Sequence, residues 1–186
     1  LETARDRLAT RPERRAELAH SRATAMINAG RYEAAEHFAR AAVDAAAQTD
    51  DPAVQSASLS ALAGALNLQG RLDEALAFSD RVMALLPRLA APESALFSER
   101  GMLLDNLGRP REAIPFHHEA VRRILEQGDR SQAVTSLANL ACSQMDAGRA
   151  HAAAGTLRRA LSLAEAHDEG AGTCNSTVQL LATVLR

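Results

Sequence analysis

The residues of this 186-residue chain with the greatest capacity for chemistry are its histidines and cysteines. His117 and His118 are adjacent, so on a helix their side chains point about 100° apart, whereas a helical metal site needs two histidines four residues apart. We expect both to be exposed surface residues. Cys142 and Cys174 stand alone, without the CxxC spacing of metal and redox sites. The other histidines, which are His20, His37, His151 and His167, have no second histidine and no cysteine at ligand spacing. The sequence therefore predicts no catalytic residue, no metal and no cofactor, and we expect the protein not to be an enzyme.

Charge and composition exclude several further classes of function. All 21 basic residues are arginine, so the lysine of a GxxxxGK[ST] phosphate-binding loop is missing. The formal net charge is -2, with acidic and basic residues mixed along the chain, and this is not the clustered positive charge of a nucleic-acid-binding surface. No apolar run has the length of a membrane span, and no signal peptide is visible. We expect a cytoplasmic protein that binds neither nucleic acid nor membrane.

The elements that position these residues are set by a Gly-Arg pair that recurs at intervals of 40, 38 and 40 residues, at Gly30-Arg31, Gly70-Arg71, Gly108-Arg109 and Gly148-Arg149. Five residues after each glycine the residue is always alanine, namely Ala35, Ala75, Ala113 and Ala153. Only a small side chain fits where two helices cross closely. A fixed period of this size indicates repeated helical hairpins that stack on one another. Each repeat is predicted to be a first helix, a glycine-centred turn and a second helix.

The full pattern predicts an all-α chain of about ten helices and no strand. The helices are expected near residues 2–9, 12–29, 32–48, 52–69, 72–86, 92–107, 110–126, 130–147, 150–166 and 172–186. Asp51 before Pro52, and Asp129 three residues before Gln132, predict helix N-caps. Pro115 lies inside one of these helices and predicts a kink or a late helix start, because it removes one backbone hydrogen bond.

These residues resemble the tetratricopeptide repeat, whose second half reads roughly Gly-x-Tyr-x-x-Ala. The matching strings are GRYEAA, GRLDEA, GRPREA and GRAHAA, and the first-helix pattern is met by Leu62-Ala63, Leu66 and Leu140-Ala141. The chain departs from the family in having no tryptophan, a single tyrosine and a spacing nearer 40 than 34 residues. The resemblance implies a right-handed superhelical solenoid of antiparallel helix pairs. Repeats of this length also look like those of large bacterial multidomain regulators.

The expected organisation is one repeat domain over residues 1–186, cut from a longer protein. Residues 1–9 would end a preceding repeat, and residues 172–186 would begin a further one. Four complete repeats are expected between them, over residues 12–50, 51–90, 91–128 and 129–168.

The resemblance also implies a concave groove lined by the first helices. The family's groove positions fall on His20, Thr24, Asn28, Ser60, Asn67, Ser98, Glu99, Met102, Asp105, Asn106, Asn139, Cys142 and Asp146, with Ile27, Gly64 and Met145 among them. A carboxamide both donates and accepts hydrogen bonds, so these asparagines suit the backbone of an extended peptide. The alternative is that an asparagine near a helix end caps the helix or faces water. Three acidic side chains, those of Glu99, Asp105 and Asp146, favour a polar or basic partner over an acidic one.

The function expected from these features is that of a scaffold that binds a protein or peptide, as the sensor or docking region of a bacterial regulatory protein. Two alternatives stay open. The array could serve self-association without a separate ligand, or it could sense a small molecule for a transcriptional regulator. An exposed apolar stripe on the first helices would favour a binding role, whereas apolar terminal faces alone would favour self-association.

Overall fold

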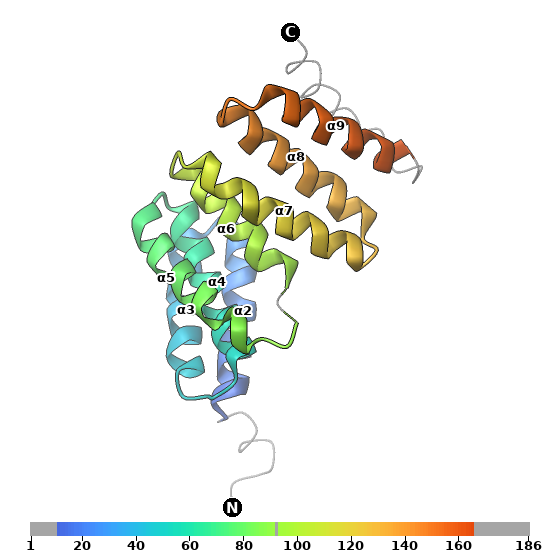
Figure 1. Ribbon diagram of the computed structural model, residues 1–186. Coiled ribbons are helices and arrows are strands. Elements are labelled where there is room, and N and C mark those ends of the chain that lie inside the picture. Colours follow the sequence, from blue (N-terminus) through green and yellow to red (C-terminus); the bar gives the residue numbers. More distant parts are fainter. Residues whose placement is uncertain (1–10, 92, 166–186) are drawn as a thin grey trace, which may run out of the picture. The chain divides into compact units, whose positions relative to one another are not determined.

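The computed structural model describes residues 11–91 and 93–165, and every regular element within these ranges is helical (Figure 1). The elements are α2 (Pro12–Asn28), α3 (Tyr32–Ala46), α4 (Pro52–Leu68), α5 (Leu72–Leu85), the 3-10 turn η1 (Leu86–Arg88), α6 (Ser94–Asn106), α7 (Pro110–Glu126), α8 (Arg130–Asp146) and α9 (Ala150–Glu165). Each α-helix falls on one of the predicted ranges. The helices predicted at 2–9 and 172–186 lie outside the described residues.

The chain divides into two compact units, Leu1–Pro92 and Glu93–Arg186, which we call the N-terminal and C-terminal units. In the N-terminal unit α2 packs antiparallel to α3 and α4 to α5, and α3 and α2 both pack against α4. The C-terminal unit repeats this arrangement, with the pairs α6–α7 and α8–α9, and with α7 and α6 both packed against α8. The predicted all-α fold of stacked antiparallel helix pairs is confirmed. Within each unit, the two first helices are neighbours.

The turn inside each pair is closed by the recurring glycine. At the first turn, the Gly30 amide donates to the Ile27 carbonyl and the Arg31 amide to the Met26 carbonyl, both at 2.9 Å. This Schellman arrangement requires a left-handed residue, and Gly30 has a φ of 68°. The other three Gly-Arg turns form the same two hydrogen bonds. So does Gly128, between α7 and α8, which lies outside the Gly-Arg series.

Two helices begin at the N-caps that the sequence predicts. The Asp51 side chain accepts from the Ala53 amide at 2.8 Å, ahead of Pro52 in the first turn of α4. The Asp129 side chain accepts from the Gln132 amide at 2.9 Å at the start of α8. Both residues therefore cap their helices as expected. Of the two outcomes expected from Pro115, the late helix start is wrong, since α7 already begins at Pro110 and includes Pro115, and the kink stays a prediction.

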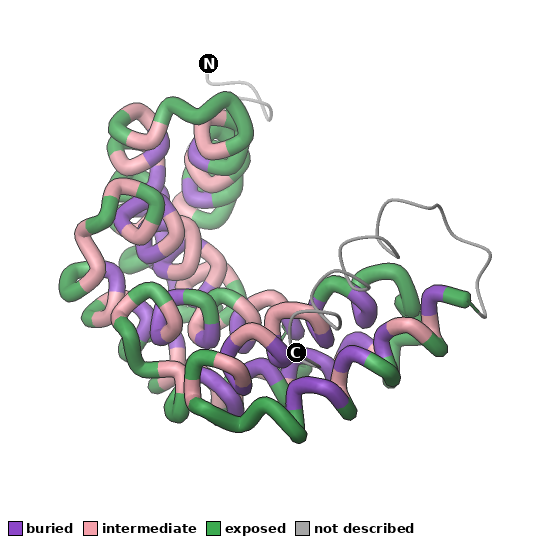
Figure 2. The backbone as a smooth tube through the Cα atoms, turned by 90° about the horizontal axis from the view of Figure 1, so that it is seen from above, coloured by how far each residue is buried: buried purple, intermediate pink, exposed green. Residues whose placement is uncertain are grey.

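Alanine makes up most of the buried apolar residues of the N-terminal unit, whereas larger apolar residues outnumber it in the C-terminal unit. The four alanines after the turn glycines are fully buried, as expected. Figure 2 shows the buried residues along the inward sides of the helices and the exposed residues at the turns. At the rim of both units an arginine lies over a phenylalanine ring: Arg22 of α2 over Phe38, and Arg100 of α6 over Phe116, each 5.7 Å from the ring centroid. Within residues 11–91 and 93–165, no helix has the length and apolarity needed to cross a membrane.

Candidate functional site

The predicted groove residues lie on the first helices, and none of them is buried. In the N-terminal unit, neighbouring helices α2 and α4 carry His20, Thr24, Asn28, Ser60 and Asn67. In the C-terminal unit, neighbouring helices α6 and α8 carry Ser98, Glu99, Met102, Asp105, Asn106, Asn139, Cys142 and Asp146. Each unit therefore brings its own candidates together on one pair of adjacent helices. That these residues bind a partner stays a prediction.

A buried polar link joins three helices of the C-terminal unit. The Nε2 atom of His117 lies 2.8 Å from Oδ2 of Asp105, and the Ser143 hydroxyl donates to the same oxygen at 2.7 Å. A carboxylate only accepts hydrogen bonds, so Nε2 carries the proton in this contact. The link connects α6, α7 and α8. Asp105, predicted as a groove residue, thus also holds two helix pairs together.

His117 corrects the expectation that both adjacent histidines are exposed. Its side chain is only 1% exposed, whereas His118 faces solvent. The ring has room because the residue opposite it on α6 is Gly101. A Cβ atom at position 101 would lie 2.5 Å from His117 Cε1, inside any normal contact distance. The absence of one side chain on α6 is therefore what allows an imidazole to enter the core.

The second oxygen of Asp105 is unusual. Oδ1 is buried and has no hydrogen-bond partner in the described part of the chain, although 24% of the side chain is exposed. A buried acceptor without a hydrogen bond costs free energy. The unpaired Oδ1 atom therefore offsets part of the stabilisation that Oδ2 gains from His117 and Ser143.

Cys142 shows no sign of an activated nucleophile. Burial raises the pKa of its thiol, and the negative charges of Asp146 and Asp105 raise it further. The thiolate is the reactive form of cysteine, so this site holds the unreactive one. Among the described residues, no three histidine, cysteine or acidic side chains are placed to hold a metal ion. Cys174 and His167 lie outside the described residues.

The N-terminal unit carries a polar cluster that links its two helix pairs. Arg71 donates to Glu36 of α3 at 2.7 Å and to both carboxylate oxygens of Glu74 at 2.6 Å. Arg40 and Gln69 also donate to Glu36, at 2.7 and 3.0 Å. Burial raises the pKa of the Glu36 carboxyl, but the hydrogen bonds from Arg40, Gln69 and Arg71 outweigh it, and the pKa lies below its ordinary value. Glu36 is therefore charged and shared between neighbouring pairs.

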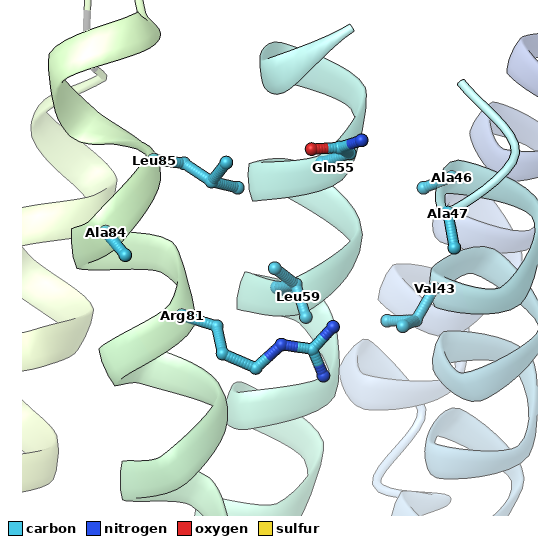
Figure 3. Close-up of a pocket in the computed structure, with 8 residues that line it drawn as sticks. All are labelled: Val43, Ala46, Ala47, Gln55, Leu59, Arg81, Ala84 and Leu85. Atoms are coloured by element: carbon cyan, nitrogen blue, oxygen red, sulfur yellow. The ribbon is translucent and has the colours of Figure 1, made fainter. Parts of the chain in front are cut away.

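Each unit has a groove on the side of its second helices. In the N-terminal unit the groove lies between α3 and α5, over α4, and has a volume of about 380 Å³ (Figure 3). Its apolar lining consists of Val43, Ala46, Ala47, Leu59, Ala84 and Leu85. The groove of the C-terminal unit lies between α7 and α9 and has a volume of about 820 Å³. It is lined by Glu119, Arg122, Glu126 and Arg159, among others.

The carboxylates that line the α7–α9 groove form ion pairs with arginines of α7. Arg122 donates to both carboxylate oxygens of Glu119, at 2.8 and 2.6 Å, and also pairs with Glu126. Arg123 donates to Glu119 at 2.7 Å. The hydrogen bonds from Arg122, followed by those from Arg123, lower the pKa of Glu119 to about 2, against a smaller opposing effect of burial. Glu119 is thus ionised throughout the physiological range.

Stacked antiparallel helix pairs, each closed by a left-handed glycine and packed mainly through the second helix of one pair against the first helix of the next, define an α-helical repeat protein. Residues 56–89 match the family model described as Tetratricopeptide repeat, which confirms the resemblance to that family. The matched segment runs from the first turns of α4 to the end of η1. The chain therefore carries a tetratricopeptide repeat in its second helix pair. A search of curated proteins finds no significant match.

Solved structures with a similar fold cover most of the chain. One contains the nearly identical TPR-like repeats of a Podosopora anserina protein assigned as a kinesin light chain, with 18% identity, a TM-score of 0.80 and coverage of 94% of this chain and 87% of that one. A second is Rap protein complexed with Competence and Sporulation Factor, with 15% identity, a TM-score of 0.75 and coverage of 93% and 54%. A third is Bacillus thuringiensis PlcR in complex with the peptide PapR7 and DNA, with 9% identity, a TM-score of 0.66 and coverage of 92% and 62%. At these identities the likeness shows the fold alone.

Proposed function

We propose that this chain is a tetratricopeptide scaffold that binds a protein or peptide through the first-helix face of each unit. The observation that carries the proposal is the accessibility of the candidate side chains on adjacent first helices, α2 with α4 and α6 with α8. Tetratricopeptide arrays in general offer extended surfaces of this kind to partners. The thiol of Cys142, held in its unreactive form, gives no support to a catalytic role.

The partner class follows from charge. Glu99, Asp105 and Asp146 lie on the first helices of the C-terminal unit, so a polar or basic peptide is favoured over an acidic one. PlcR, one of the proteins with this fold, was solved with a peptide. We extend this to a role for the chain as the sensor or docking region of a bacterial regulatory protein in the cytoplasm.

Self-association is the second candidate function, and a specific observation favours it. Three large apolar side chains are exposed on first helices: Leu18 (52% exposed), Leu68 (46%) and Met102 (40%). Exposed apolar surface of this kind is typical of protein contacts. A second copy of the chain would be one way to cover it.

Selection of a displayed random peptide library against the full chain tests the proposal. The peptides it enriches are expected to be polar or basic. Their dissociation constants are then compared in two variants. The first carries Thr24→Ala, Asn28→Ala, Asn106→Ala and Asp146→Asn, all at exposed first-helix positions. The matched control carries Glu33→Gln, Asp73→Asn and Arg111→Gln, at exposed second-helix positions.

We expect the first variant to bind at least about tenfold more weakly, as loss of one or two hydrogen bonds to a charged or polar partner would give. The control should bind as the wild type does. Equal affinities in both variants would remove the first-helix face as the site. A failure to enrich peptides, together with concentration-dependent sedimentation, would favour self-association.

A further inference from the structure

We propose that the groove between α3 and α5 docks an extended acidic peptide segment, with a carboxylate held by Arg81 and an adjacent apolar side chain resting on Leu59. This site lies on the second-helix side of the N-terminal unit and is separate from the first-helix faces. The inference therefore stands independently of the function proposed above.

The groove is shaped for an apolar group. Val43 lines it from α3 and Ala47 from the residue after this helix, Ala84 and Leu85 line it from α5, and Leu59 of α4 lies between them. Its volume of about 380 Å³ falls within the range of about 300–1,000 Å³ typical of ligand sites. The groove runs along α4 between α3 and α5, over Gln55 and Leu59. A chain in extended conformation suits such a channel better than a compact ligand.

Arg81 supplies the charge. Figure 3 shows its side chain reaching from α5 across the groove toward Leu59. Its guanidinium lies 5.5 Å from the centroid of the Phe78 ring, and it forms no ion pair with the described residues. None of the described residues that line the groove is acidic. An arginine in this position offers a planar fork of donors that matches a carboxylate.

The groove of the C-terminal unit provides an internal comparison. Arg81 and Arg159 both lie eleven residues after a turn glycine, and both line the groove of their unit. The α7–α9 groove contains two carboxylates of its own, those of Glu119 and Glu126. In the N-terminal unit, the position that corresponds to Glu119 is Ala41. The α3–α5 groove therefore contains a cation without the carboxylates that line the α7–α9 groove, and an acidic partner would complement it.

A titration of the isotope-labelled full chain with a short synthetic peptide of alternating leucine and aspartate, followed by NMR, tests this inference. Shifted amide signals are expected at Val43, Ala47, Ala84 and Leu85, and they should saturate. A second peptide, with asparagine in place of aspartate, probes the need for the carboxylate. Octanoate probes whether a free carboxylate with an apolar tail is enough.

Three variants complete the design. Arg81→Gln should weaken the leucine-aspartate peptide at least about tenfold, the loss expected for a hydrogen bond to a charged group. Ala84→Glu places a carboxylate at the exposed wall of the groove and should have the same effect by repelling the peptide. Arg159→Gln is the matched control and should leave the affinity unchanged. Thermal unfolding of each variant shows whether it is folded. Because Arg81→Gln and Ala84→Glu should both lower the affinity for the peptide, the test stays valid if one of them does not fold.

Several outcomes would overturn the inference. No saturable shifts, shifts outside the α3–α5 groove, or equal binding of the asparagine peptide would each do so. Octanoate binding as tightly as the peptide would mean that the groove takes a small carboxylate and not a peptide.

Discussion

The imidazole of His117 occupies the space that a side chain on Gly101 would need, because a Cβ atom there would lie 2.5 Å from His117 Cε1. The corresponding pairs in the other repeats are Ala23 with Ala39, Ala63 with Ser79, and Ala141 with Leu157. In the third repeat the first helix has glycine where the other repeats have alanine, and the partner on the second helix is histidine. The two positions therefore share one volume of core.

Replacement of Gly101 by alanine is expected to destabilise the protein. Overpacking of a buried site costs about 1–3 kcal/mol, which exceeds the gain in helix propensity of about 1 kcal/mol. Gly64→Ala is the matched control, because Gly64 also lies inside a first helix but has no atom within 4 Å of its added Cβ. That variant should be more stable than the wild type by about 0.5–1 kcal/mol. Urea unfolding measures both changes, and the same sign for the two would contradict the shared-volume interpretation.

Removal of the Asp105 carboxylate is expected to destabilise the protein even in the absence of a ligand. Asp105→Ala leaves the His117 Nε2 proton buried without an acceptor, at a cost of about 1–3 kcal/mol. Ser143→Ala removes only one of the two hydrogen bonds to Asp105 and should cost less. Asp146→Ala, at an exposed position of α8, should stay within about 0.5 kcal/mol of the wild type.

The three free energies of unfolding, measured side by side, decide this point. If Asp105→Ala and Asp146→Ala were equally stable, the link to His117 would contribute nothing. Because Asp105 has this structural role, Asp146 is the better position for testing the acidic character of the first-helix face.

The ion pairs of Glu119 predict a dependence of stability on acid pH. The pKa of this carboxyl in the folded protein is about 2, below its ordinary value of 4.5. Its contribution to stability is therefore fully present above pH 4.5 and is lost as the pH falls toward 2. Glu119→Gln should show a smaller loss of melting temperature across this window than the wild type. Arg122→Gln should behave in the same way, since it removes the main donor, and an unchanged pH profile in both variants would rule out this contribution.

The helices could be predicted almost completely because their ends depend on local chemistry. Proline in the first turn, an aspartate N-cap and a left-handed glycine each act within a few residues, so a short stretch of sequence is enough to place them. Gly128 could have been recognised by the same rule. Pro115 was harder to place, because proline in the second turn of a helix costs a hydrogen bond without forcing the helix to begin later.

The contacts between helix pairs were missed because they depend on residues far apart in sequence. Glu36 is the one charged residue at its repeat position, where the other repeats have Leu76, Ile114 and Ala154. A charge in an otherwise apolar register indicates a partner from the next repeat, which here is Arg71. In the same way, a glycine at position 101 together with a large residue at 117 was a signal that the histidine is buried.

The two Arg-Phe contacts at the rims of the units bear on the history of the chain. Gly30 and Gly108 are 78 residues apart, as are Gly70 and Gly148. The same spacing relates several pairs of identical residues: Arg22 and Arg100, Phe38 and Phe116, Asp51 and Asp129, and Arg81 and Arg159. Adjacent repeats share only the phenylalanine, since Phe78 stands at the same position of the second repeat. A tandem duplication of a block of four helices would leave this pattern, with the two compact units as its two copies. Positions that differ between the units, such as Ala41 and Glu119, would then mark where the copies diverged.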